Sequence, residues 1–145
     1  CIVRTSWLFG VGGKCFPDTI LRLAEARNEL EVVDDQRGSP THVPDLAQAI
    51  MQLCRDGARG IVHATNRGEC SWYELAGFLL KAAGSSTRVR PIPSEKVSRP
   101  AKRPAYSVLS AKSLDAYKIA MPSWQEGVEL YLDQRKEVER EKLLG

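Results

Sequence analysis

The chain has 145 residues, of which 43% are hydrophobic and 27% are charged, as in an ordinary globular domain with a sizeable core. Its formal net charge is only +3 and it contains no long basic block, so electrostatics predict no nucleic-acid partner. No apolar run approaches the roughly 20 residues that a helix needs to span a bilayer, so no membrane partner is predicted.

Hydrophobic spacing and breaker residues predict strands and helices in mixed order. The predicted elements are, in chain order, a strand at 2–9, a glycine-rich loop at 10–14, a helix at 17–27, a strand at 30–33, a polar loop at 34–41, a helix at 45–55, a strand at 60–64, a helix ending at 83, a strand at 87–92, an irregular proline-rich stretch to 104, a short helix ending at 117 and a last helix after 123. This order predicts an α/β fold, and it contains no strand–GxGxxG–helix unit.

Local signals mark two helix starts and two helix faces. Ser71 with Glu74, and Ser123 with Glu126, have the S-x-x-E spacing of a capping box. In the helix at 45–55, the residues expected to share one face are Leu46, Ala47, Ile50, Met51 and Cys54. In the last helix, they are Trp124, Val128, Tyr131 and Leu132.

We expect a domain over residues 1–132, followed by a charged tail at 133–145 that is solvated or frayed. The chain begins with Cys1 rather than Met, and its first residues resemble a strand already under way, so we expect a longer parent protein. The start has no charged region ahead of an apolar stretch and does not resemble a signal peptide. The four cysteines include no CxxC pair, which predicts reduced thiols in a cytoplasmic protein.

Most groups that could carry catalysis or bind a metal favour a structural interpretation. The loop at 10–14 matches neither a phosphate loop nor a dinucleotide turn, so a flexible connection is expected. His42 and His63 have no ligand pattern around them, and no Ser/His/Asp set can be argued. Asp34 and Asp35 are adjacent and would face opposite sides of an extended segment, which argues against a paired acid/base site.

Two features allow a binding role beside a structural one. Trp7, near the end of the first strand, is either a core residue or an apolar wall against a sugar ring. Arg99, Lys102 and Arg103 lie among prolines and form either a solvated basic loop or a diphosphate site, because guanidinium groups suit phosphate oxygens.

Three segments in a fixed order resemble a known family. They are RTSWLFG at 4–10, DDQRGSPTHVPDLAQAI at 34–50 and RPAYSVLS at 103–110. Together they resemble the C-terminal half of the dTDP-4-dehydrorhamnose reductases, which are extended short-chain dehydrogenases/reductases. The most specific part is the D-Q-x-G-x-P-T run, whereas the following V-x-D-L-A-x-A-I pattern is shared more widely among nucleotide-sugar enzymes. The resemblance extends from Ile2 to about Leu132.

This resemblance implies an α/β fold that is the C-terminal portion of an extended short-chain dehydrogenase, lacking most of the N-terminal Rossmann domain. It implies the substrate-binding part of a reductase that uses NADPH (or NADH) on a dTDP-linked 4-keto-deoxysugar and forms dTDP-L-rhamnose. It also implies that the glycine-rich loop is a mobile lid beside the pocket. The implied substrate-binding residues are Trp7, Gln36, Thr41, Arg103 and Ser107.

The family's glycine fingerprint, GxGxxG, is absent from the sequence. Its Y-x-x-x-K pair is also absent, because none of the four tyrosines has a lysine four residues later. We therefore expect no catalytic, cofactor-binding or metal-binding residue on this chain alone, and no activity. The expected partners are the dTDP-linked deoxysugar and the missing N-terminal domain of the same protein, with a homodimer left open. The alternatives are another nucleotide-sugar reductase or epimerase of the same superfamily, or a non-catalytic regulatory homologue.

Overall fold

The computed structural model describes residues 1–97 and 100–144 and has the mixed α/β order that the sequence predicts. The elements are, in chain order, β1 (Ile2–Arg4), β2 (Leu8–Phe9), α1 (Phe16–Ala26), β3 (Glu29–Val33), β4 (Arg37–Gly38), β5 (Thr41–His42), α2 (Val43–Arg55), β6 (Ile61–His63), β7 (Cys70–Ser71), α3 (Trp72–Ala82), β8 (Arg88–Ile92), a 3-10 turn at Ser94–Lys96, α4 (Lys112–Asp115) and α5 (Trp124–Leu144).

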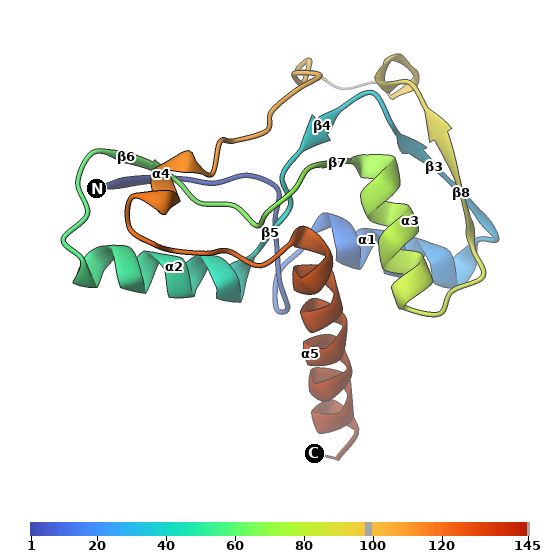
Figure 1. Cartoon of the computed structure of the whole chain (residues 1–145). Coiled ribbons are helices and arrows are strands. Elements are labelled where there is room, and N and C mark those ends of the chain that lie inside the picture. The colour runs from blue at the N-terminus through green and yellow to red at the C-terminus, as the bar shows by residue number, and fades with distance from the viewer. Residues whose placement is uncertain (98–99, 145) are drawn as a thin grey trace.

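The described strands form four two-stranded sheets rather than one continuous sheet. β1 pairs with β6, β2 with β5, and β3 with β8, all in parallel, whereas β4 pairs with β7 in antiparallel register. Parallel pairing requires a long crossover, so each parallel pair joins segments that are far apart in sequence. β1, β6, α2 and α4 lie on one side of the molecule, and β3, β8, α1 and α3 lie on the other (Figure 1).

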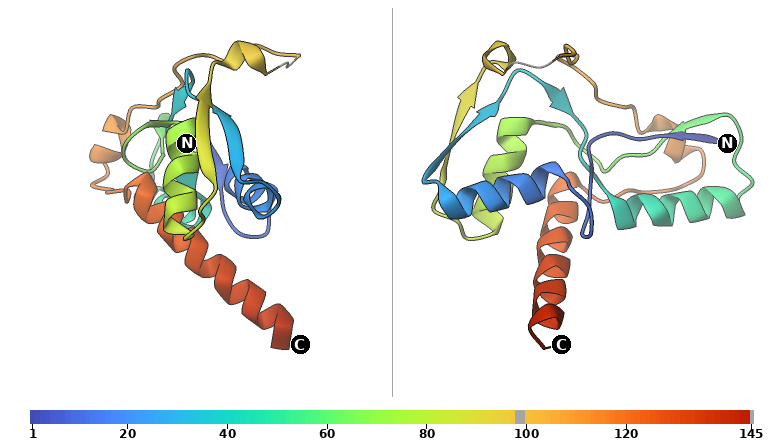
Figure 2. Two further views of the ribbon diagram at one scale, coloured as in Figure 1. Left: turned by 90° about the vertical axis from the view of Figure 1, so that its right-hand side faces the viewer. Right: turned by 180° about the vertical axis from the view of Figure 1, so that it is seen from behind.

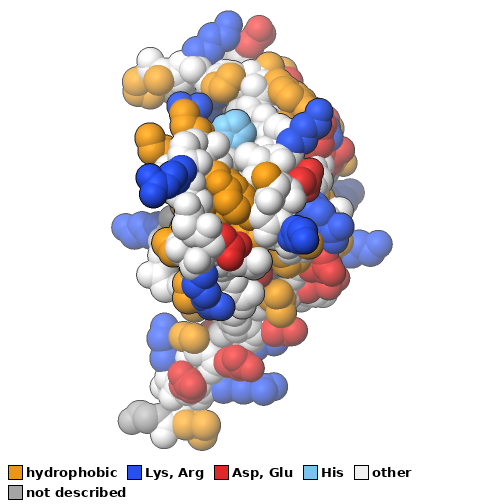
Figure 3. All heavy atoms as spheres, turned by 60° about the vertical axis from the view of Figure 1, so that its left-hand side comes forward, with side chains coloured by type: hydrophobic (Ala, Val, Ile, Leu, Met, Phe, Trp, Pro, Cys, Tyr) orange, Lys and Arg blue, Asp and Glu red, His pale blue; other side chains and the backbone are white. Residues whose placement is uncertain are grey.

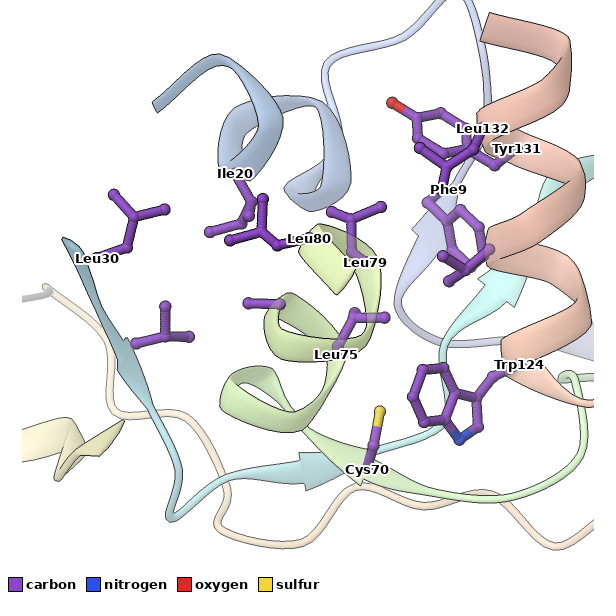
Figure 4. Close-up of a cluster of buried hydrophobic side chains, with 13 residues drawn as sticks. Phe9, Ile20, Leu30, Cys70, Leu75, Leu79, Leu80, Trp124, Tyr131 and Leu132 are labelled. Carbon is purple, nitrogen blue, oxygen red and sulfur yellow. The ribbon is translucent and has the colours of Figure 1, made fainter. Parts of the chain in front are cut away.

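Two hydrophobic clusters correspond to these two sides. The larger one, which we call the α3 core, brings together α1, α3, α5 and β3 (Figure 4), with buried residues that include Ile20, Leu30, Leu75, Leu79, Val128 and Tyr131. The smaller one, the α2 core, lies between α2, β6 and α4, with buried residues that include Leu46, Ala49, Leu53, Val62 and Leu114. The binding features described below lie beside the α3 core.

The single strand predicted at 2–9 is two strands in the structure, and the prediction was wrong for residues 5–7. β1 ends at Arg4 and β2 begins at Leu8, because the backbone turns at Trp7, whose φ of 47° is left-handed. The polar loop predicted at 34–41 likewise contains β4 and part of β5. These short strands have partners far along the chain, which a local pattern does not identify.

The helix predicted at 45–55 is confirmed as α2, but its predicted face was wrong except for Leu46. Its buried apolar residues are Leu46, Ala49 and Leu53, while Ile50 and Met51 are 37% and 51% exposed. Two apolar stripes with helical spacing run along this helix. Only packing against β6 and α4 decides which of the two is buried.

The last helix, α5, starts at the predicted capping box, with both reciprocal hydrogen bonds between Ser123 and Glu126. Its predicted face is buried in the α3 core. The charged segment expected as a tail continues this helix to Leu144 and leaves the body in both further views (Figure 2). Among residues 1–97 and 100–144, no helix is both long and apolar enough to cross a membrane.

Candidate functional site: two chambers around a tryptophan pair

Trp7 lies in the turn between β1 and β2, and its ring stacks on Trp72 at the start of α3. The two ring centroids are 3.5 Å apart and the planes differ by 8°. A left-handed backbone is unusual for a bulky residue and marks a strained position that the surrounding structure must stabilise. Both rings are only half-buried, so the pair forms part of the surface of the site rather than of the core alone.

Two cavities share this pair as a wall. The larger one, here called the large chamber, has a volume of about 520 Å³, and the smaller one, the small chamber, has about 300 Å³. Trp7, Trp72, Gln36 and Arg103 line both chambers. A ligand that fills both chambers would therefore pass these four side chains.

Both chambers are mainly apolar, and each adds a few polar side chains of its own. The large chamber is mainly apolar, with a lining that includes Phe16, Ile20, Leu23, Val32, Val33 and Leu75. Lys14 and Cys15, at the end of the glycine-rich loop, also line it. The small chamber is also mainly apolar, and it is completed by Ser6, Pro104 and Ser107.

Arg103 is the basic group that both chambers share. Its guanidinium carbon lies 5.9 Å from the centroid of a Trp72 ring, within the range of a cation–π contact. Its side chain is exposed, so its donors remain available to an anionic ligand. Lys102 lines neither chamber, and Arg99, the third member of the basic cluster predicted from the sequence, lies outside the described residues.

The segment that carries Arg103 is docked on β4 by backbone hydrogen bonds. The Arg37 N–H donates to the Ala105 carbonyl at 2.8 Å, and the Ser107 N–H donates back to the Arg37 carbonyl at 2.9 Å. The Ser107 hydroxyl also donates to the Arg37 carbonyl at 3.1 Å. Ser107 therefore both fastens this segment and lines the small chamber.

A charged cluster next to β4 strengthens the same docking. Arg37 lies 3.0 Å from Glu69 and 3.2 Å from Glu74, and the Tyr106 hydroxyl donates to Glu69 at 2.7 Å. This hydrogen bond from Tyr106, followed by the one from Arg37, lowers the pKa of Glu69 from its ordinary value. The same bond raises the pKa of Tyr106.

Asp34 and Asp35 have separate partners, as expected for adjacent residues on an extended segment. Asp34 accepts a hydrogen bond from the Ser71 hydroxyl at 2.5 Å. Asp35 accepts from the backbone N–H and the hydroxyl of Ser94, and the backbone hydrogen bond is the main cause that lowers the pKa of Asp35. The two carboxylates hold neighbouring segments in place and do not form a paired acid/base site.

Thr41, for which the family resemblance implies substrate binding, does not line either chamber. It is fully buried, its N–H donates to the Trp7 carbonyl at 3.1 Å, and its hydroxyl points to the Ser39 carbonyl at 3.4 Å. Thr41 pairs with Leu8 in the β2–β5 ladder and supports the turn that carries Trp7. The other four predicted residues do line the chambers.

The two histidines lie away from the chambers. His42 is fully buried, and its backbone N–H donates to the Asn66 side chain, which in turn donates to Asp45 at 2.8 Å. His63 is part of β6. In the part of the chain that the structure describes, no group of three or more His, Cys, Asp or Glu side chains could hold a metal ion.

Sequence reasoning missed Trp72 and Phe16. Trp72 directly follows the capping-box serine, and an aromatic residue at this position is typical of the first turn of an amphipathic helix. Phe16 lies 4.6 Å from Trp72 between ring centroids and resembles any apolar residue at a helix start. No local signal separated them from core residues, because their role depends on α1 and α3 meeting Trp7.

Comparison with known proteins places the chain beside one family over nearly its whole length. The sequence profile of the RmlD substrate binding domain matches residues 1–137. The spore coat polysaccharide biosynthesis protein SpsK of Bacillus subtilis is 42% identical over 92% of this chain and 47% of its own length.

Two crystal structures agree with this match. A dTDP-4-dehydrorhamnose reductase from Clostridium acetobutylicum superposes with a TM-score of 0.90 at 38% identity, over 93% of this chain and 48% of that protein. The Bacillus anthracis dTDP-4-dehydrorhamnose reductase, solved in complex with NADP, has a TM-score of 0.86 at 40% identity, over 92% and 47%. The chain thus spans about half the length of these relatives, and the matches confirm the extended short-chain dehydrogenase fold.

Proposed function

The chain belongs to the family of RmlD substrate-binding domains, and we propose that it is the substrate-binding part of an NADPH-dependent reductase. The proposed reaction of the whole protein converts a dTDP-4-keto-6-deoxy-L-sugar to dTDP-L-rhamnose. The observation that carries this proposal is the arrangement of two adjoining chambers that share Arg103 and the tryptophan pair as lining residues.

The chambers suit the three parts of a nucleotide sugar. A flat base fits the large chamber, where Phe16 and Trp72 supply aromatic surface. The diphosphate lies at Arg103, whose guanidinium group can bind phosphate oxygens with two parallel hydrogen bonds. The sugar occupies the small chamber, where Ser6 and Gln36 can meet its hydroxyl groups and the indole of Trp7 forms an apolar wall.

The reduction itself is assigned to a part of the protein that this chain does not contain. The family tyrosine donates a proton and its lysine helps to lower the pKa of that tyrosine, and neither has an equivalent in this sequence. The nicotinamide cofactor would supply the hydride. A relative solved with NADP supports NADPH as that cofactor.

The surface of α2 and of the β1–β6 pair offers a place for that remaining part. Ile2 and Ile61 are 62% and 53% exposed, and the outer stripe of α2 adds Ile50 and Met51. Apolar side chains appear among charged ones on this side of the molecule (Figure 3). We propose that the N-terminal half of the same protein covers this surface, and a second copy is the competing occupant.

Titration of the chain with dTDP-L-rhamnose at fixed ionic strength tests the proposed site. Arg103→Ala should weaken binding by about 1.5–3 kcal/mol, the range for a charge-assisted hydrogen bond, which is about ten- to a hundredfold. Arg103→Lys should also weaken it, although the charge is kept, because a planar fork becomes a point charge.

Lys102→Ala is the matched control, since it removes one positive charge from the neighbouring position without touching either chamber. Its effect on the affinity should be small. Equal, small losses for all three variants would show that the basic segment is solvated and that the nucleotide sugar binds elsewhere.

A further inference from the structure

Gly38 lies against the ring of Trp7 so closely that no larger residue fits. A Cβ atom at position 38 would be 2.3 Å from Cε2 of Trp7 and 2.6 Å from both Cζ2 and Nε1. These distances are far below normal van der Waals contact. Gly38 is not among the glycines with a left-handed φ, so the space for the indole, and not backbone freedom, explains why a glycine stands here.

Other contacts fix the ring of Trp7 on a second side and hold the backbone that carries it. The ring stacks on Trp72 at 3.5 Å between centroids. The Trp7 carbonyl accepts the Thr41 N–H at 3.1 Å, and the preceding Ser6 hydroxyl donates to the Ser39 carbonyl at 2.8 Å. Gly38 itself is buried in β4, paired with Cys70 across the β4–β7 ladder. The backbone of β4 at Gly38 therefore packs directly against one face of the Trp7 side chain.

The position of this indole decides the shape of both chambers, because Trp7 and Trp72 are shared walls. We propose that Gly38 is a positioning residue that sets the place of the Trp7–Trp72 pair and thereby the boundary between the two chambers. This inference rests on the proposed function. It adds that Gly38 controls where the base subsite in the large chamber ends and the sugar subsite in the small chamber begins.

The proposal separates two ligands that differ only by the sugar. dTDP needs only the large chamber and Arg103, where the tryptophan pair is a small part of the wall. dTDP-L-rhamnose must also enter the small chamber, where the pair is a larger part of the wall. A displaced indole should therefore reduce affinity for dTDP-L-rhamnose more than affinity for dTDP. A purely structural role of Gly38 would weaken both ligands alike or lower the melting temperature alone.

The stack also provides a spectroscopic signal that needs no ligand. Two indoles this close couple their electronic transitions, and a skew between the two transition dipoles gives paired bands of opposite sign in circular dichroism. The third tryptophan, Trp124, packs on Phe78 at 5.1 Å in the α3 core and is removed from the spectrum with a Trp124→Phe background. In that background, Trp72→Phe should abolish the paired bands, and its spectrum is the reference for a protein without the stack.

The decisive variant is Gly38→Ala, with Gly77→Ala as the matched control because an added Cβ at Gly77 meets nothing within 4 Å. We expect Gly38→Ala to lose the paired bands while the helical signal remains. It should weaken dTDP-L-rhamnose binding by about tenfold or more, and dTDP binding by less than about threefold. Gly77→Ala should leave the bands and both affinities unchanged.

A second measurement covers the case in which Gly38→Ala does not fold. In a Trp7→Ala background the clashing ring is gone, so adding Gly38→Ala should cost no further stability. If the double variant also fails to fold, or is clearly less stable than Trp7→Ala alone, the indole is not the partner of Gly38 and the proposal is overturned.

Unchanged bands in Gly38→Ala, or equal weakening of the two ligands, would also overturn it. If wild-type protein binds neither ligand, the proposed function fails. The bands and the double-variant comparison would then still decide whether Gly38 positions Trp7.

Discussion

Replacing Trp7 by alanine should weaken binding of the nucleotide sugar and destabilise the chain without unfolding it. A fully buried aromatic residue loses about 3–5 kcal/mol of stability on truncation to alanine. Trp7 is only half-buried, and its stack on Trp72 contributes about 0.5–1.5 kcal/mol beyond its buried area. We therefore expect Trp7→Ala to lower the free energy of unfolding by about 2–3 kcal/mol and to leave the chain folded.

The binding effect follows from the surface that the indole offers to both chambers. If a bound sugar covers about 60 Å² of the ring, the lost contact corresponds to about 1.5 kcal/mol, or roughly a tenfold weaker complex. Trp7→Phe keeps part of that wall and should weaken binding by less. Isothermal titration with dTDP-L-rhamnose measures the affinity, and guanidinium chloride unfolding measures the stability of the same samples.

Trp124→Phe is the matched control, because it is the same chemical change at a tryptophan that lies in the α3 core and lines neither chamber. Trp124→Phe should lower stability without changing the affinity, and Trp7→Phe should change both. If Trp7→Ala lowers the stability while dTDP-L-rhamnose binds with wild-type affinity, Trp7 is a core residue and the wall assigned to it does not exist.

Two further predictions concern the cofactor and the pH dependence of stability. The chain alone should show no reductase activity and weak or no NADPH binding, because its sequence has no strand–GxGxxG–helix unit to hold a pyrophosphate. Measurable NADPH oxidation with the dTDP-4-keto sugar would contradict this. The lowered pKa of Asp35, caused mainly by the Ser94 N–H, means that its contribution to stability is present above the ordinary carboxyl pKa of about 4 and is lost as the pH falls through the lower folded value. Urea unfolding at neutral and acid pH should therefore show wild type and Asp35→Asn converging in acid, and a difference that persists there would refute the assignment.

The basic segment shows which site residues a sequence motif can identify and which contacts only the structure reveals. The family resemblance of the RPAYSVLS segment at 103–110 selected Arg103 and Ser107, and both line the small chamber. The same run of sequence did not show that Ser107 also binds the Arg37 carbonyl, because that contact joins residues 70 positions apart. Thr41 was selected by an equally good motif and proved to be a buried support. A motif position therefore marks a neighbourhood, and the packing decides whether a side chain faces the cavity or the backbone behind it.

Local physical chemistry in the sequence determined the helices, their capping boxes at Ser71 and Ser123, and the strands β3 and β8, because caps, breakers and periodicity act over a few residues. The tertiary structure alone decided which stripe of α2 is buried, where the first strand breaks, and that Trp72 stacks on Trp7 beside Gly38. These features depend on contacts between segments that are distant along the chain. Such contacts have no period and no local signal, and they arise only when the two cores bring α1, α3 and β4 around the turn that carries Trp7.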